Sequence, residues 1–317
     1  ELQKLTLTTL VPGVIDEDIR RGGLLGRIPL AQAKGQTITW NRTNAVRTGK
    51  TAAIGDLLTW EEADTLTAVT AELRKIYDQS RLDNFVDALY DTVNDYEAAQ
   101  LLSLQSSVTK KLEDEVIYGD FTYGTNEFDG LHAHAEGNSA NGDIDEGEGA
   151  HSIANLRVMV DHMKYNVDWL LTSYELGRRF DAWMQEAGQA VANGFVNGIY
   201  TMPVNDFGMR VTFFQGIPMI RSDYMVAEQA NTGVGSDARA KRTTGTNQYS
   251  IIGVKMGSSG FLGGNDPGLV LGFGGANNEL GQMFRSERFD KLENYDAAGL
   301  RLMGHFALMS GSVRAVT

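Results

Sequence analysis

An apolar stripe in the first half of the chain constrains its fold more than any other feature. Its members recur at spacings of three and four, which predicts one long amphipathic helix over residues 91–118. At about 1.5 Å per residue this helix is roughly 40 Å long, natural for a structural spine and long for a small enzyme domain. We expect Gly119 and, after an aromatic and glycine-rich loop, Gly130 to supply left-handed backbone angles. The stripe consists of Leu101, Leu104, Val108, Leu112 and Val116.

Two β-branched segments before this helix predict a long hairpin. Residues 36–47 and 65–77 partly alternate, as strands do, and the sequence between them contains Gly49 and Gly55. A two-stranded ribbon by itself is only marginally stable in water. We therefore expect a projecting arm with a flexible tip that finds a surface on another subunit.

The remaining sequence mixes helical and strand patterns. Asp83 or Asn84 is placed to cap a short helix, and Ser152 a second one. The run Thr172-Ser173-Tyr174-Glu175 fits a capping box that opens a third helix. Residues 1–35 lack a steady period and are interpreted as an arm lying over something else. Helices and strands are partly segregated, so the predicted class is α+β. The other predicted strands cover residues 167–172, 209–214, 217–225, 249–257, 299–309 and 312–316.

Composition excludes several classes of protein. The 317 residues contain no cysteine, which excludes disulfides, thiolate metal sites and cysteine nucleophiles. No apolar run approaches the roughly 18 residues that a membrane span needs, and no secretory signal is visible. We therefore expect no membrane partner.

Charge is unevenly distributed along the chain. The net charge of −13 argues against wrapping nucleic acid through phosphate neutralisation. Residues 1–50 carry eight bases and four acids, whereas residues 51–151 carry five bases and 22 acids. The remaining residues balance at fifteen of each. A basic leading segment thus precedes a strongly acidic middle.

Two candidate chemical motifs are weak. Residues 44–51 almost match a phosphate-binding loop, but Asn44 stands where glycine is needed and no convincing helix follows. His132 and His134 suggest a metal site, yet the loop that follows is polar and glycine-rich, so we interpret them as surface histidines. The acids and histidine that would complete the metal site are Glu136, Asp143, Asp145 and His151.

Two further patterns carry no enzyme chemistry either. Residues 253–275 contain nine glycines without a dinucleotide-binding turn, and predict a closely packed loop region. Acid pairs such as Asp114-Glu115 and Glu61-Glu62 are interpreted as a solvated face. We therefore predict no catalytic, cofactor-binding or metal-binding residue and no enzyme activity.

The order of these parts resembles the major capsid proteins of tailed double-stranded-DNA bacteriophages, which have the Hong Kong 97-type fold. The resemblance covers nearly the whole chain by pattern. It rests on the helix end and its loop, on the strand that leads into a capped helix, and on the later strands. The segments that carry it are "EDEVIYGD", "FDGL", "WLLTSYELGRRF", "FFQGIPMIRSDYM", "IIGVKMG" and "GLRLMGHFALMSGSVRAV".

The resemblance implies a division of the chain into five parts. They are an N-terminal arm (1–35), an E-loop hairpin (36–77), a peripheral domain with the spine helix (78–187), an axial domain (188–278) and return strands of the peripheral domain (279–317). Such subunits often lose an N-terminal scaffolding segment, and the first residue here is Glu1 rather than Met. We therefore expect a mature, processed form.

The resemblance also implies function and partners. Copies would form pentamers and hexamers of an icosahedral head, joined by E-loops and N-terminal arms. The head would enclose DNA without sequence-specific binding and be part of the virion, assembled in the host cytoplasm. A scaffold, a maturation protease, a portal and decoration proteins are further implied partners.

We expect the basic arm to meet the acidic region 51–151 of neighbouring copies. An encapsulin-like compartment that holds enzyme cargo is the alternative reading. A tail or receptor-binding protein is a further alternative, and a P-loop nucleotide hydrolase using Lys50 a distant one. The predicted inter-subunit contact residues are Arg20, Arg21, Arg27, Arg42, Arg47, Lys50 and Trp60.

Overall fold

The computed structural model describes residues 20, 23–45, 48–58, 60, 65–85, 96–124, 126–136, 144, 152–190, 200–201, 212–229, 238–243, 248–260, 266–274, 283–293 and 295–317. Its helices are α3 (Tyr96–Tyr118), α4 (Leu131–Glu136), α5 (Ile153–His162), α6 (Tyr174–Ala190) and α7 (Ala238–Thr243), with a 3-10 turn η2 (Val313–Ala315). Its strands are β1 (Leu30–Ala33), β2 (Thr37–Ala45), β3 (Thr65–Glu72), β4 (Arg74–Asp83), β5 (Trp169–Ser173), β6 (Tyr200–Thr201), β7 (Phe213–Phe214), β8 (Ile217–Ser222), β9 (Ile252–Val254), β10 (Leu269–Gly274), β11 (Arg285–Phe289) and β12 (Ala297–Ser310). Among the described residues, no helix combines the length and the apolar composition that crossing a membrane requires.

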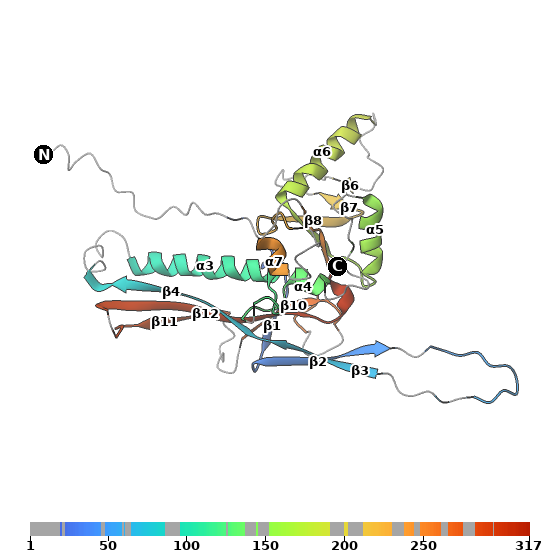
Figure 1. Cartoon of the computed structure of the whole chain (residues 1–317), viewed down its shortest axis with the longest axis horizontal. Coiled ribbons are helices and arrows are strands. Elements are labelled where there is room, and N and C mark those ends of the chain that lie inside the picture. The colour runs from blue at the N-terminus through green and yellow to red at the C-terminus, as the bar shows by residue number, and fades with distance from the viewer. Residues whose placement is uncertain are drawn as a thin grey trace.

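The spine helix α3 lies along a five-stranded sheet (Figure 1). Strand β12 is the centre of this sheet and pairs with β4, β10 and β11, while β1 adds to β10 in parallel. The predicted stripe is confirmed at four positions, which are buried, but Leu101 is 39% exposed. The helix ends at Tyr118 as predicted, and residues 91–95 lie outside the described residues. Helix and sheet thus form two layers around one core.

A second sheet and two helices form a lobe at the top of Figure 1. Its sheet has the order β6-β7-β8-β5-β9, with β5 buried along its whole length. Helices α5 and α6 belong to this lobe, and their apolar faces share a core cluster with β5 and β8. The predicted turn at Gly216 is confirmed as a two-residue hairpin turn, because Gln215 and Gly216 both have positive φ, as such turns require.

Helix starts in this lobe follow local capping rules. Ser152 caps α5 as predicted, since its hydroxyl accepts a hydrogen bond from the Asn155 amide. The predicted capping box at 172–175 is wrong, because Ser173 rather than Thr172 caps α6. Ser173 accepts from the Leu176 amide, whereas Thr172 donates to the Ile220 carbonyl.

The predicted hairpin is present as β2 and β3, paired antiparallel from Thr37↔Glu72 to Ala45↔Thr65. It projects well beyond the body of the molecule (Figure 1). The second strand is shorter than expected, because the chain breaks at Leu73 and continues as β4 into the spine sheet. Ile38 and Leu73 are buried at the base of the hairpin, in a cluster with Val270 and Met309.

Several expectations about the rest of the chain are wrong. Residues 24–33 do not form a free arm, because Leu24 and Ile28 are buried in this chain's own core and β1 joins its sheet. The glycine-rich region 253–275 contains the buried strand β10. The expected last strand at 312–316 is the η2 turn. Strand β4 continues to Asp83, where a helix was expected to begin. Residues 84–85 are helical, and residues 86–90 of the expected short helix lie outside the described residues.

Gly119 and Gly130 are required for close packing rather than for left-handed angles. Neither has positive φ, contrary to expectation. A Cβ on Gly119 would lie 2.3 Å from the Phe128 carbonyl oxygen, and one on Gly130 would lie 2.5 Å from that of Glu115. The two glycines are joined by a hydrogen bond from the Gly130 amide to the Gly119 carbonyl, 2.8 Å. They let the chain return against the last turn of α3.

We expect Gly130→Ala to lower the free energy of unfolding by about 1–3 kcal/mol, because its Cβ would press on backbone atoms that cannot rotate away. Gly26→Ala is the control, since a Cβ there meets nothing within 4 Å. Urea denaturation of both variants measures the difference. Equal stabilities would contradict the close-packing argument.

Candidate functional sites at the hairpin and at the end of the spine helix

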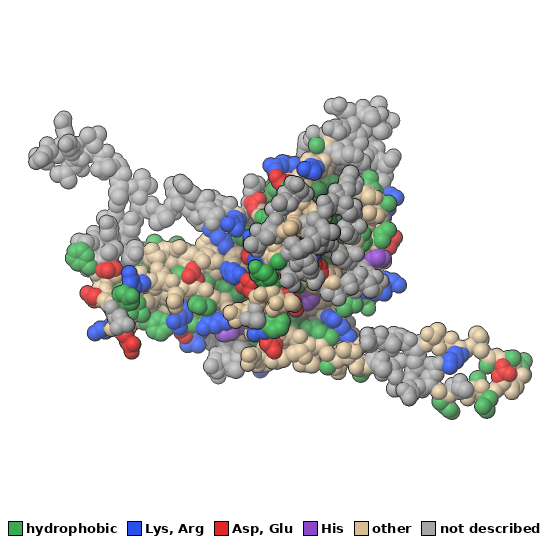
Figure 2. Space-filling model, viewed as in Figure 1, with side chains coloured by type: hydrophobic (Ala, Val, Ile, Leu, Met, Phe, Trp, Pro, Cys, Tyr) green, Lys and Arg blue, Asp and Glu red, His purple; other side chains and the backbone are tan. Residues whose placement is uncertain are grey.

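The tip of the hairpin carries large apolar side chains that are exposed. Trp60 is 100% exposed, and Ile54, Leu57 and Leu58 are also exposed. Figure 2 shows these green side chains at the far end of the hairpin. Large apolar groups clustered at one exposed place mark an interaction site more often than a solvated surface.

The tip is shaped by a turn. The Asp56 amide donates to the Ala53 carbonyl, 3.2 Å, and the Ala53 amide donates to the Asp56 carboxylate, 2.8 Å. Gly55 has a φ of 98°, which suits glycine. Residues 48–58 form no helix, so the helix that a phosphate-binding loop needs is missing there. The P-loop alternative is therefore wrong at this position.

Arg42, in the outer half of β2, fixes the hairpin to the body. Its Nε donates to the Gly311 carbonyl at 2.9 Å, and an Nη donates to the Ser310 carbonyl. Its guanidinium carbon lies 5.6 Å from the centre of the Trp40 ring. Burial lowers the pKa of Arg42, although arginine stays charged. This residue thus binds the end of β12 in its own chain, and its predicted contact with another subunit stays a prediction.

The other predicted contact residues lie at separate places. Lys50 and Trp60 are exposed at the tip, and Arg27 is exposed beside the body. Arg20 is exposed, with its guanidinium carbon 5.8 Å from the centre of the Tyr224 ring. Arg21 and Arg47 lie outside the described residues. Their role between subunits stays a prediction.

The end of α3 carries three consecutive acids that are buried rather than solvated. Glu113, Asp114 and Glu115 are between 4% and 9% exposed. This contradicts the interpretation of Asp114-Glu115 as a solvated face, and it removes these acids as targets for a neighbour's basic arm. Burial raises the pKa of Glu113, although the Gly23 and Leu25 amides oppose this, and burial also raises the pKa of Glu115.

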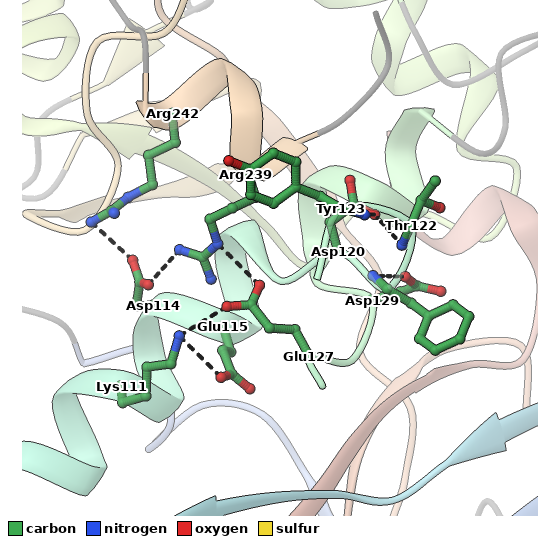
Figure 3. Close-up of polar contacts among 11 residues, drawn as sticks. Lys111, Asp114, Glu115, Asp120, Thr122, Tyr123, Glu127, Asp129, Arg239 and Arg242 are labelled. Carbon is green, nitrogen blue, oxygen red and sulfur yellow. Dashed lines mark hydrogen bonds and ion pairs between the residues drawn. The ribbon is translucent and has the colours of Figure 1, made fainter. Parts of the chain in front are cut away.

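Helix α7 supplies most of the counter-charges (Figure 3). Arg239 bridges two carboxylates, with Nη1 2.6 Å from Asp114 and Nε 3.0 Å from Glu127. Arg242 reaches the other Asp114 oxygen at 2.9 Å. Burial alone would lower the pKa of Arg239, but Asp114 and Glu127 outweigh it and raise it. Lys111 of α3 completes the set, 3.1 Å from Glu115 and 3.0 Å from Glu127.

The loop between α3 and α4 is held by its own aspartates. The Asp120 carboxylate accepts from the Thr122 and Tyr123 amides at 2.8 and 3.3 Å. Asp129 accepts from the Phe121 amide at 3.0 Å. These bonds place Glu127 where Arg239 and Lys111 can reach it, as Figure 3 shows.

The two histidines are not surface residues, contrary to expectation. His132 lies on α4, is 7% exposed and stacks on Tyr118 with ring centres 5.7 Å apart. Its Nε2 lies 3.0 Å from Glu228, which also accepts from Tyr118 and Ser250. Burial lowers the pKa of His134, whose ring lies 3.4 Å from the Leu308 carbonyl.

This polar group does not form a recognisable reactive or metal centre. The Ser250 hydroxyl donates to Glu228 rather than to His132, so these residues do not form the serine–histidine pair of a nucleophilic centre. Within the described ranges, no group of three His, Asp or Glu is arranged to hold a metal ion. Asp143, Asp145 and His151 lie outside those ranges.

Comparison with solved structures identifies the fold. The SrpI encapsulin of Synechococcus elongatus PCC 7942 matches over 100% of this chain and 92% of its own, with TM-score 0.64 and 13% identity. The cyanophage A-1(L) capsid covers 97% and 94%, with TM-score 0.65 and 13% identity. The capsid of a native GTA particle covers 98% and 94%, with TM-score 0.63 and 10% identity.

The chain has the Hong Kong 97-type fold. No protein-family model and no curated protein sequence matches it, so the likeness rests on structure. In the terms of this fold, the β2–β3 hairpin is the E-loop and α3 the spine helix. The division into five domains stays a prediction.

We expect Arg239→Met to lower the free energy of unfolding by about 3–5 kcal/mol, because it leaves buried carboxylates without their partner. Arg178→Met is the matched control, since Arg178 pairs with Glu175 at 3.7 Å on the surface, where such pairs contribute under about 1 kcal/mol. Chemical denaturation of both variants provides the measurement. If Arg239→Met lowers the free energy of unfolding no more than Arg178→Met does, the buried ion pairs of Arg239 do not stabilise the fold.

Proposed function

We propose that this chain is the shell subunit of an icosahedral phage-type head that encloses double-stranded DNA. The observation that carries the proposal is the E-loop, which holds exposed Trp60 and Leu57 away from its own body. We expect a copy of the same molecule to cover this limb, because exposed clusters of large apolar side chains mark interaction sites. The likeness to shell proteins over nearly the whole chain supports this reading.

Burial of the tip supplies a driving force for assembly. Removing one large apolar side chain from water contributes about 1.5–3 kcal/mol, and four such side chains lie at the tip. Each contact can be weak, because many contacts close together in a ring or shell. Closed symmetry also covers the open edges of the β2–β3 ribbon.

The contents of the shell distinguish a DNA-filled phage-type head from an enzyme-filled encapsulin-like compartment. A net charge of −13 suits a wall that does not hold packaged DNA tightly or read its sequence. The virion, assembled in the host cytoplasm, is then the site of action, with a scaffold, maturation protease, portal and decoration proteins as further partners. The likeness to the SrpI encapsulin favours a second candidate, an enzyme-filled compartment.

Negative-stain microscopy of the purified protein tests the shell, and closed particles are expected. Absorbance and nuclease treatment of disrupted particles then distinguish DNA from protein contents. A monodisperse monomer at all concentrations and salts would reject both candidates. Neither candidate requires enzyme activity or a cofactor.

Replacing Leu57 and Trp60 by Asp should abolish or strongly reduce shell yield, because charge at the tip prevents its burial against a neighbour. The melting temperature of the unassembled subunit should stay unchanged, since neither side chain is buried in it. Size-exclusion chromatography measures yield. Tyr165→Asp, at an exposed aromatic on the body, controls for added charge. Normal yield from the tip variant would refute the role of the tip.

Reversing Arg20, Arg21 and Arg27 to Glu should lower shell yield most at low salt, where exposed charges are least screened. Yield against ionic strength for variant and parent provides the measurement. Assembly that is unchanged at low salt would show that the arm does not act through its charge.

A further inference from the structure

Along β2, every second side chain is turned toward the body of the molecule, as strand geometry requires. Ile38 is buried, and Trp40 and Arg42 are half-buried, whereas the residues between them are exposed. On the paired strand, Val69 and Ala71 lie opposite Trp40 and Ile38 and are half-buried too. The face of the hairpin that meets the body is thus apolar near the base, and Arg42 is its outer, charged member.

Apolar packing holds the hairpin near its base. Ile38 and Leu73 belong to the buried cluster there, and Trp40 is partly buried against it. Arg42 lies four residues beyond Ile38, about 13 Å further out at about 3.3 Å per residue. A bond at that distance resists rotation of the hairpin about its base more effectively than a bond at the base, because it acts on a longer arm.

The hairpin joins the body through one narrow base. Strand β2 is reached from β1 through residues 34–36, where Gly35 has a φ of 102°. Strand β3 passes into β4 through Leu73 alone, and the Leu73 amide donates to the Gln36 carbonyl at 2.9 Å. The two connections are short and bonded to each other, so the hairpin is attached as a single limb whose angle needs a second support.

Arg42 provides a two-point attachment beyond this base. Its Nε donates to the Gly311 carbonyl at 2.9 Å, and its Nη2 donates to the Ser310 carbonyl. A planar guanidinium presents its donors in a fixed fork, which a lysine ammonium does not, and two successive carbonyls match that fork. The guanidinium carbon also lies 5.6 Å from the centre of the Trp40 ring. The side chain is therefore held on two sides.

The acceptors of these bonds belong to a closely packed part of the body. Ser310 is paired with Leu269 of β10, and the Gly311 amide donates to the Gly268 carbonyl at 3.0 Å. A Cβ on Gly311 would collide with the Asp266 carbonyl oxygen. The hairpin is thus bonded to a fixed point at the end of β12.

We propose that Arg42 is a positioning residue that sets the direction in which the hairpin leaves the unassembled subunit, and thereby where the apolar tip meets a neighbouring copy. Its bonds to Ser310 and Gly311 select one angle of the hairpin about its base. The effect on assembly rests on the proposed shell function. The direction of the hairpin is a property of the single subunit and is tested separately.

Distances between two spin labels test the direction of the hairpin. The chain contains no cysteine, so Leu66→Cys on β3 and Tyr77→Cys on β4 provide the only labelling sites, and both parent side chains are exposed. The sites lie on either side of Leu73 and at most about 36 Å apart, at about 3.3 Å per residue. Leu57→Asp and Trp60→Asp are included in every labelled protein to disfavour assembly, and the monomer fraction from size-exclusion chromatography is measured.

We expect one narrow distance distribution when Arg42 is present. Arg42→Met keeps a long side chain but removes both donors, and should broaden or shift the distribution by about 4 Å. This is the displacement of Leu66 for a tilt of about 10° over the roughly 23 Å from Leu73. Arg179→Met is the matched control, because Arg179 is an exposed arginine of α6 that lies 5.8 Å from the centre of the Tyr249 ring, and it should leave the distribution unchanged. An unchanged distribution in Arg42→Met would overturn the proposal.

A second variant keeps the test decisive if Arg42→Met does not fold. Arg42→Gln places a shorter polar side chain at this half-exposed strand position and also lacks the guanidinium fork. The same broadening or shift is expected, and its absence would again overturn the proposal. Circular dichroism and the melting temperature of each labelled protein establish that the body is folded before the distances are compared.

Negative-stain images of unlabelled protein with the native tip test the effect on assembly. Arg42→Met should yield fewer closed shells and a wider range of particle sizes than the parent. Parent-like shells from a variant whose hairpin direction has changed would overturn the positioning role in assembly. If the parent itself forms no shell, the proposed function fails, whereas the label distances still decide whether Arg42 sets the direction of the hairpin.

Discussion

The pairing of buried charges at the end of the spine helix is the interaction that holds α7 and the loop after α3 together. Glu113, Asp114 and Glu115 lie in the last two turns of α3, and no base occupies its last turn. A negative charge at this end of a helix is destabilised by the helix dipole, and burial destabilises it further. The arginines of α7 remove both penalties by binding Asp114 and Glu127. The segment that carries α7 is thereby fixed on the spine.

This arrangement explains why the loop after α3 is so closely specified. Gly119 and Gly130 allow the backbone to pass over the helix end without a side chain between. Asp120 and Asp129 then fix the loop so that Glu127 joins the ionic cluster. His132 follows on α4, within reach of Glu228. One short stretch thus ends α3, places Glu127 beside Arg239 and places His132 beside Glu228.

Local patterns in the sequence predicted the elements they determine. The stripe of α3, the Ser152 cap and the turn at Gly216 depend on neighbours a few positions away, and all three are confirmed. The part of β4 beyond residue 77 was missed because two of its inward positions, Asp78 and Ser80, are polar. The Ser80 hydroxyl donates to Gln100 on α3. Strand β10 was missed because its glycines resemble a loop.

The polar cluster could not be predicted from sequence because its members are far apart. Asp114 and Arg239 are separated by 125 positions, and His132 and Glu228 by 96. An acidic run on a helix is usually solvated, and only tertiary contact shows that this one is buried. The hairpin was predicted as an element, whereas the bonds from Arg42 to the end of β12 were not.

The anchored base makes the hairpin a lever. Strand β2 has nine residues, which span about 30 Å at about 3.3 Å each. A tilt of about 10° at the base would therefore displace the outer end of the strand by about 5 Å. Small movements at the buried base, around Ile38 and Leu73, are therefore magnified at the outer end, and we expect the packing there to influence the angle between neighbouring copies in an assembly.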